Sequence, residues 1–336
     1  MPPPRLAIAR LAHRYGDRPA LADVSLTIHD REIFGFLGPN GSGKTTLFRV
    51  LSTLIPPQEG QVTFHLPTRP GAPAPSAVEG ERGNPSDTTV FDLRTARDDI
   101  RRHIGVVFQS PSLDKQLTAE ENLRHHGHLY GLRGRDLESR IDEMLARVGL
   151  AQRPRELVGR FSGGMRRRVE LAKGLLTRPS ILLLDEPSTG LDPGARIDLW
   201  RYLREIRRQS GATILVTTHL MDEAEQCDRL AILDAGRLAA CDTPAALKAR
   251  IGADVITLTG DDPDALAAAV RQQFNLPAER IGSIVRIERD RGHEFIPQLV
   301  EALAGQVRSV SLGKPTLEDV FIHVTGHGFR HEAAGH

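Results

Sequence analysis

The feature that most constrains the fold is a glycine-rich segment, GPNGSGKT at residues 38–45, which fits the pattern G-x-x-x-x-G-K-[ST] at every fixed position. The apolar residues 33–37 before it predict a buried strand. Leucine or valine at positions 47, 50, 51 and 54 after it predicts one face of a helix. A glycine-rich loop between a strand and a helix is typical of a segment that wraps phosphate groups with its backbone N–H groups.

Within this segment, the phosphate loop, two side chains suggest specific roles. Lys44 is predicted to neutralise the β- and γ-phosphates of a nucleotide, and Thr45 to ligate Mg²⁺. The alternative, a glycine-rich turn without a ligand, explains the flanking strand and helix less well. The predicted nucleotide-binding residues here are Gly38, Pro39, Asn40, Gly41, Ser42, Gly43, Lys44, Thr45 and Thr46.

An acidic pair follows a second apolar run, at residues 181–184. A carboxylate at the end of a buried strand can reach a metal beside the phosphates, so Asp185 is predicted to be a Mg²⁺ ligand. Glu186 points the other way along the strand and is available to orient or deprotonate a water. By themselves the two acids could simply cap the turn before Pro187. Together with the phosphate loop they predict a nucleoside triphosphatase.

A third motif indicates which group of nucleoside triphosphatases this chain resembles. Residues 161–165 read FSGGM, which resembles the LSGGQ-like signature of the ATP-binding cassette (ABC) superfamily, with Phe161 in place of Leu and Met165 in place of Gln. Versions with an initial aromatic residue and a Met are similar to the exporter branch that includes drug, nodulation-factor and polysaccharide exporters. A serine hydroxyl and glycine N–H groups that open a helix form a second anion site. The resemblance implies a head-to-tail homodimer, in which Ser162, Gly163 and Gly164 complete the partner's ATP site.

The resemblance extends over residues 5–251 and implies further roles. Tyr15 would stack on the adenine ring, although on local evidence alone a strand-edge tyrosine explains it equally well. Gln109 would contact Mg²⁺ and the attacking water and sense a membrane partner, and His219 would contact the γ-phosphate. Residues 188–192 would link the two ATP sites. The expected catalytic residues are Glu186, His219, Gln109 and Lys44, and the expected metal ligands are Thr45, Gln109 and Asp185.

The order of apolar segments predicts an α/β fold. Uninterrupted apolar strands that alternate with helices indicate a parallel sheet covered on both faces. We expect an ABC-type P-loop nucleotide-binding domain at residues 5–251, with a mixed sheet and a helical subdomain at about 112–178. Residues 118–121 (TAEE) predict a capping box that opens one of its helices.

The remaining segments predict an insertion, an accessory domain and a tail. Proline and glycine punctuate residues 67–89, which predicts a flexible insertion. Short alternating elements at residues 252–325 predict a small C-terminal α+β domain. Residues 314–321 (KPTLEDVF) resemble the C-terminal end of drug-exporter cassettes, although this stretch also reads as the start of an amphipathic helix. Residues 326–336 are expected to be disordered.

The amino-acid composition indicates which kinds of partner the chain is expected to bind. The 44 basic residues nearly balance 43 acidic ones, which argues against a surface built to bind nucleic acid. The run at residues 166–168 (RRR) predicts either a solvated helix face or pairing with a nearby phosphate or acid. Two cysteines suit a reducing compartment. No apolar run is long enough to span a membrane, so a transport role needs a permease on a separate chain.

We therefore expect the ATP-hydrolysing subunit of an ABC exporter of a drug, lipid or glycan. It would use ATP and Mg²⁺, form a homodimer and lie peripherally at the cytoplasmic face of the inner membrane. One alternative is a soluble ABC ATPase that acts on nucleic acid or ribosomes. Another is a non-hydrolysing scaffold, which the intact acidic pair and signature disfavour.

Overall fold

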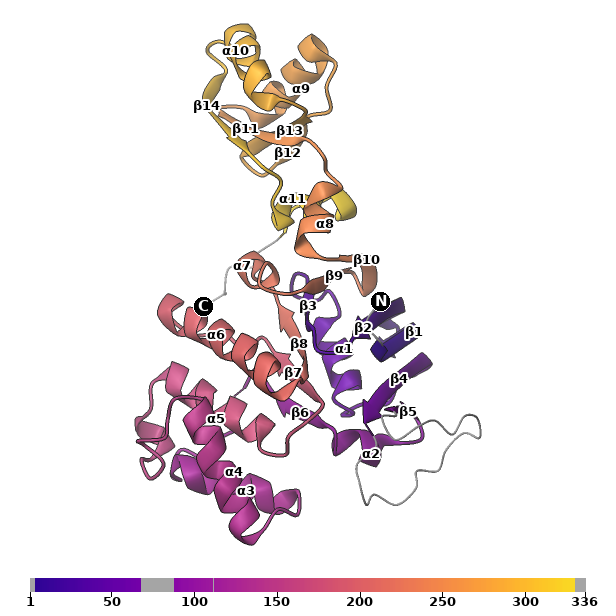
Figure 1. Cartoon of the computed structure of the whole chain (residues 1–336). Coiled ribbons are helices and arrows are strands. Elements are labelled where there is room, and N and C mark those ends of the chain that lie inside the picture. The colour runs from indigo at the N-terminus through magenta and orange to yellow at the C-terminus, as the bar shows by residue number, and fades with distance from the viewer. Residues whose placement is uncertain (1–3, 68–87, 111, 330–336) are drawn as a thin grey trace. The chain divides into compact units, whose positions relative to one another are not determined.

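The computed structural model describes residues 4–67, 88–110 and 112–329. The chain divides into two compact units, Met1–Leu238 and Ala239–His336 (Figure 1). This division comes earlier than the change expected at residue 252, because helix α8 (Pro244–Ala249) packs against α11 (Leu317–Thr325) within the C-terminal unit. Within the described residues, no helix is both long enough and apolar enough to cross a membrane.

The core of the N-terminal unit is formed by five strands in the order β9-β3-β8-β7-β6, and β10, within which the division at residue 238 falls, pairs with β9 as the sixth strand of this sheet. Its pairs from β6 to β9 are all parallel, as the uninterrupted apolar runs predicted. Every residue of β3, β7 and β8 is buried. The strands are β3 (Ile33–Leu37), β6 (Ile104–Val107), β7 (Ile181–Asp185), β8 (Thr213–Thr218), β9 (Arg229–Asp234) and β10 (Arg237–Asp242).

The parallel arrangement places the predicted motifs at one edge of the sheet. The phosphate loop follows β3, Asp185 ends β7, and Gln109 and His219 come shortly after β6 and β8. Because the carboxyl ends of neighbouring parallel strands share one edge, segments far apart in the sequence meet there.

A second, four-stranded antiparallel sheet in the order β2-β1-β4-β5 was not predicted from the sequence. Its strands are β1 (Pro4–Tyr15), β2 (Arg18–His29), β4 (Glu59–Pro67) and β5 (Thr88–Asp92). A bulge between Ile8 and Leu11, where Arg10 has a φ of 49°, interrupts the two-residue alternation that would reveal β1.

The expected insertion at residues 67–89 begins and ends inside this antiparallel sheet. Pro67 pairs with Thr88, and Leu66 pairs with Thr89, so both edges of the expected segment belong to strands. Residues 68–87 lie outside the described part of the chain.

Helices follow several of these strands, and those between Ala119 and Leu175 fall within the range 112–178 in which a helical subdomain is expected. The predicted capping box is confirmed: Thr118 Oγ1 accepts from the backbone N–H of Glu121, whose carboxylate accepts from the backbone N–H of Thr118. The helices are α1 (Lys44–Leu51), α2 (Arg97–Arg101), α3 (Ala119–Leu129), α4 (Gly134–Arg147), the 3₁₀ turn η1 (Val158–Arg160), α5 (Gly163–Leu175), α6 (Pro193–Ser210) and α7 (Met221–Ala224).

The C-terminal unit has its own sheet, in the order β12-β13-β11-β14, and its own core. Its elements are β11 (Asp254–Gly260), α9 (Pro263–Phe274), β12 (Glu279–Ile281), β13 (Ile284–Arg289), α10 (Gly292–Ala302) and β14 (Val307–Gly313), together with α8 and α11. The expectation of disorder from residue 326 is wrong for residues 326–329, because Phe329 is buried with its ring centroid 4.7 Å from that of Phe321. Residues 330–336 lie outside the described residues.

Asp319→Ala is expected to destabilise the C-terminal unit by about 3 kcal/mol. The Asp319 carboxylate accepts from the backbone N–H of Thr316, the N-cap residue of α11, and from Nε of the buried Arg286 at 2.8 Å. The substitution removes a helix cap and a partner of a buried charge. Urea unfolding followed by circular dichroism measures the loss. The exposed neighbour Glu318, changed to Ala, is the control, and an equal effect of both changes would contradict the assignment.

Candidate functional site

At two positions of the phosphate loop, only glycine can adopt the observed backbone conformation or fit the space beside it. A Cβ at Gly38 would lie 2.4 Å from Leu233 O and 2.5 Å from Ser42 Oγ, which is impossibly close. Gly43 precedes α1 with a φ of 100°, a left-handed conformation that residues with a Cβ avoid. The loop can therefore pass close to its neighbours and turn sharply into the helix. This is the backbone shape that the sequence pattern predicted.

Lys44 is the buried cation of this loop. Its Nζ donates hydrogen bonds to Gly38 O at 2.7 Å and Pro39 O at 2.9 Å. Burial lowers the pKa of Lys44, while the nearby carboxylates of Glu186 and Asp185 raise it. Asp185 is also buried, which raises its pKa, and a hydrogen bond from Thr217 partly offsets this rise. A partly desolvated cation at a loop rich in N–H donors favours an anionic ligand that can approach it.

Glu186 is the point where the predicted catalytic residues meet. Its Oε2 accepts a hydrogen bond from Gln109 Nε2 at 3.2 Å, and its Oε1 lies 3.2 Å from Nδ1 of His219. Thr189 Oγ1 also donates to Oε2 at 3.2 Å. The structure therefore brings together three of the four residues that the sequence singled out as catalytic, from the ends of three different strands.

Two threonines support this arrangement: Thr217, which the sequence analysis missed, and Thr189, which lies in the segment 188–192 that is expected to link the two ATP sites. Thr217 Oγ1 donates to Asp185 Oδ1 at 2.6 Å and accepts from the backbone N–H of Glu186 at 3.0 Å. That bond holds Glu186 at a φ of 42°, a strained conformation for a residue with a side chain. The only local signal was the Thr-Thr pair at the end of β8, which is equally typical of an ordinary strand. The second threonine, Thr189, follows the acidic pair.

A cavity of about 290 Å³ opens beside the phosphate loop. It brings together Tyr15, the loop and Glu186, as the predicted nucleotide site requires. It also includes a short segment at the start of β2 that sequence reasoning missed, since nothing in its composition marks a ligand site. The lining residues are Tyr15, Arg18, Pro19, Ala20, Asn40, Gly41, Gly43, Lys44, Thr45, Thr46 and Glu186.

The signature segment lies at a different cavity, of about 330 Å³. Ser162 caps α5, with its Oγ accepting from the backbone N–H of Met165 at 3.2 Å. Ser162 and Gly164 line this cavity together with Asp192, and none of the described residues lines both it and the phosphate-loop cavity. The structure thus does not bring the signature segment to the phosphate loop within one chain.

The arginine run beside the signature does not form a solvated helix face, which is one of the two environments that the sequence had suggested. Arg167 is buried, and its guanidinium donates to three backbone carbonyls, at Phe108, Asp185 and Pro187. Arg166 bonds the local Phe161 O, and Arg168 bonds Val148 O. A helix that packs against strand ends can use arginine to satisfy their carbonyls, and composition alone does not reveal such packing.

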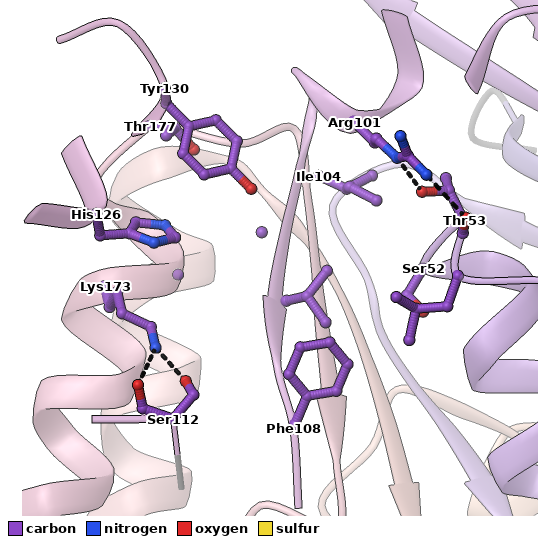
Figure 2. Close-up of a pocket in the computed structure, with 14 residues that line it drawn as sticks. Ser52, Thr53, Arg101, Ile104, Phe108, Ser112, His126, Tyr130, Lys173 and Thr177 are labelled. Carbon is purple, nitrogen blue, oxygen red and sulfur yellow. Dashed lines mark hydrogen bonds between the residues drawn. The ribbon is translucent and has the colours of Figure 1, made fainter. Parts of the chain in front are cut away.

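A third cavity, of about 280 Å³, lies between α3 and α5 on one side and β6 with the end of α1 on the other (Figure 2). Its rim carries exposed apolar side chains, among them Leu54, Phe108 and Tyr130. Lys173 and Ser112 lie on the wall below His126, and Lys173 Nζ donates to Ser112 (Figure 2). Phe108 immediately precedes Gln109, so this cavity adjoins one of the predicted catalytic residues.

The residues at the phosphate loop fit a nucleoside triphosphate with Mg²⁺. Ser42 Oγ is buried, with its residue 2% exposed, and within the described part of the chain it has no hydrogen-bond partner. A buried hydroxyl costs free energy unless it is paired, and a phosphate oxygen can pair with it. Thr45 and Asp185 supply the hydroxyl and carboxylate oxygens that Mg²⁺ prefers. The donor set is therefore consistent with the predicted ligand.

Comparison with known proteins agrees with this geometry. Residues 21–189 match the family described as ABC transporter, and residues 243–325 match the family described as ATP-binding protein DrrA1-3-like, C-terminal domain. The chain is 37% identical to the daunorubicin resistance ATP-binding protein DrrA3 of Streptomyces coeruleorubidus, over 93% of each chain. It is 36% identical to the Nod factor export ATP-binding protein I of Rhizobium johnstonii, over 96% of each.

Solved structures show the same fold. A structure of the ATP-binding subunit of an ABC transporter superposes with a TM-score of 0.59 at 28% identity, covering 74% of this chain and 93% of that one. The shared fold, the phosphate loop and the two family matches lead to one conclusion. The chain belongs to the ABC transporter family of ATP-binding, ATP-hydrolysing proteins, in the branch that carries a DrrA-like C-terminal domain.

Proposed function

We propose that this chain is the ATP-hydrolysing subunit of an exporter of a drug, lipid or glycan. It would work with a permease on a separate chain at the cytoplasmic face of the inner membrane. The observation that carries the proposal is the convergence of Gln109 and His219 on Glu186 beside the phosphate-loop cavity. Relatives named for daunorubicin resistance and Nod factor export, similar over nearly the whole chain, support the export role. They lend no support to a role on nucleic acid or ribosomes.

In this proposal each residue at the cavity has one task in ATP hydrolysis. Lys44 neutralises the β- and γ-phosphates, and Tyr15 stacks on the adenine. Glu186 orients and deprotonates the attacking water, while Gln109 and His219 hold the Glu186 carboxylate in place. Mg²⁺, held by Thr45, Gln109 and Asp185, would neutralise charge on the phosphates. Catalysis of this kind is mostly positioning and charge stabilisation.

The proposal includes a head-to-tail homodimer. The signature residues Ser162, Gly163 and Gly164 lie at the start of a helix whose N-terminus suits an anion. Ser162 and Gly164 line a cavity separate from their own phosphate loop. Two copies in opposite orientation would place each signature against the other copy's nucleotide. ATP then forms part of the interface, so dimerisation depends on ATP and hydrolysis separates the subunits.

We assign permease docking to the cavity in Figure 2. The exposed apolar side chains at its rim are typical of a surface that a partner covers. Because Phe108 lies at this rim and directly precedes Gln109, a partner seated here can move the Gln109–Glu186 pair.

Affinity purification of the tagged chain from detergent-solubilised membranes of its own host tests this assignment. A multi-spanning membrane protein is expected with the wild type and about tenfold less of it with Leu54→Asp, because a charge at this 55% exposed apolar side chain opposes docking. Leu129→Asp, at an 83% exposed leucine outside the cavity lining, is the matched control. Salt-sensitive recovery of RNA or ribosomes instead of a membrane protein would contradict the export role.

His126, on the wall of this cavity, predicts a pH dependence of stability. Burial, assisted by the positive charge of Lys173, lowers the pKa of His126 to about 4, against 6.5 in the unfolded chain. Between these values the unfolded state binds a proton that the folded state does not. The free energy of unfolding therefore keeps the full contribution of the neutral His126 above pH 6.5 and loses it as the pH falls towards 4.

Between pH 7.5 and 4.5, the free energy of unfolding of the His126→Gln variant should fall by on the order of 2 kcal/mol less than that of the wild type. Urea unfolding at the two pH values measures this difference. His128→Gln, at an exposed position on the same helix, is the control. If the His126 variant keeps the wild-type pH dependence, the half-buried, neutral His126 is not the cause of that dependence.

A further inference from the structure

The inward face of α5 carries three buried charged side chains that hydrolysis itself does not explain. Arg167, Glu170 and Lys173 are 8%, 2% and 9% exposed, and their spacing of three residues places them on one side of the helix. Buried charges are costly unless specific partners satisfy them. Ser162, the signature serine, is the N-cap residue of α5. The residues that bond these three side chains therefore show which segments are connected to the signature helix.

Arg167 attaches the helix to both sides of the catalytic pair. Its Nη1 donates to Phe108 O at 2.7 Å, the residue before Gln109. Its Nε donates to Pro187 O at 2.7 Å and its Nη2 to Asp185 O at 3.3 Å, the residues on either side of Glu186. Burial lowers the pKa of Arg167 to about 10, so the guanidinium is still charged at neutral pH. Only arginine presents several donors in one rigid plane, which lysine cannot replace.

Glu170 and Lys173 hold the other end of the Gln109 segment, at Ser112. The backbone N–H of Ser112 donates to Glu170 Oε1 at 2.6 Å, and Lys173 Nζ donates to Ser112 O at 3.4 Å and to Ser112 Oγ (Figure 2). Lys173 and Glu170 also form an ion pair at 3.3 Å. The backbone on both sides of Gln109 is thus bonded to the signature helix.

We propose that Arg167 is a positioning residue that couples the two ATP sites of the dimer. It connects the signature helix, which serves the partner's nucleotide, to the Gln109–Glu186 pair, which serves the nucleotide of its own chain. This inference rests on the head-to-tail dimer of the proposed function. When Ser162 engages the partner's ATP, a shift of α5 moves the carbonyls on either side of Glu186. One site then reports its occupancy to the other, as coupling between sites requires.

Mixed dimers with one active site test the coupling. A chain with Glu186→Gln paired with a wild-type chain, isolated through two different tags, keeps one active site and is the reference. The single active site combines Glu186 of the wild-type chain with the signature helix of the Glu186→Gln chain. Arg167→Gln in the Glu186→Gln chain therefore disturbs the signature helix of that site. Arg167→Gln in the other chain disturbs the segment around its active Glu186. Both placements are expected to lower kcat about tenfold or more, the rate equivalent of one charge-assisted hydrogen bond. The KM for ATP stays within about twofold, because the phosphate loop is untouched.

Two further variants separate positioning from folding. Arg167→Lys keeps the charge but cannot reach three carbonyls, so it should show the same loss in both placements even if the glutamine variant folds poorly. Arg208→Gln removes an exposed arginine that pairs with Glu205 and is the matched control. Fluorescence of Trp200, the single tryptophan of the chain, monitors folding of each variant.

The outcomes separate the coupling from the dimer itself. A loss in only one placement, or in neither, would overturn the coupling while leaving the dimer intact. A reference pair that does not associate with ATP would overturn the head-to-tail assembly and the coupling with it. A fall in kcat in both placements, without a change in KM and with Trp200 fluorescence unchanged, supports the coupling, because each placement disturbs a different end of the connection through Arg167 while the chain stays folded.

Discussion

Glu186→Gln is expected to lower the rate of ATP hydrolysis by about 10² to 10⁴, the usual contribution of a general base, while ATP still binds. The amide keeps the size of the side chain but cannot accept the proton of the attacking water. It also keeps only one of the two oxygens that contact Gln109 and His219 and puts an NH₂ donor in place of the other. Steady-state phosphate release measures the loss.

The same variant should accumulate as a dimer with ATP, because the nucleotide that forms part of the interface is no longer hydrolysed. Size-exclusion chromatography with ATP and with ADP detects this change. Glu205→Gln, at a surface glutamate paired with Arg208, is the control and should turn over normally. Full turnover in the Glu186 variant would show that another group activates the water.

Lys44→Ala is expected to weaken ATP binding by roughly 100-fold, or about 3 kcal/mol, the value of charge-assisted bonds to two phosphates. The substitution removes the buried cation beside Asp185 and Glu186, leaving a site in which negative charge dominates. Titration with a fluorescent ATP analogue measures the dissociation constant. Lys115→Ala, at an exposed lysine, is the control.

The two variants fail in different ways, which makes them a joint test of the site. The Glu186 change should spare binding and lower turnover, whereas the Lys44 change should lose affinity first. If Lys44→Ala binds ATP as well as the wild type, the loop does not hold the phosphates through this side chain.

The sequence by itself determined the motifs that are contiguous. The phosphate loop requires glycine at Gly38 and Gly43 for reasons that are local to the backbone, so its pattern can be read without a structure. The apolar runs that became β7 and β8 likewise predicted a parallel sheet, because both faces of such strands are buried.

Only the tertiary structure decided which distant groups meet. The sheet order brings Gln109 and His219 to Glu186, and no spacing along the chain contains that information. The burial of Arg167 was also invisible, because an arginine run is usually solvated and its carbonyl partners come from other strand ends. The antiparallel sheet was missed where the bulge at Arg10 breaks the alternation. Local patterns record backbone and burial requirements, whereas contacts between remote elements depend on how the whole chain packs.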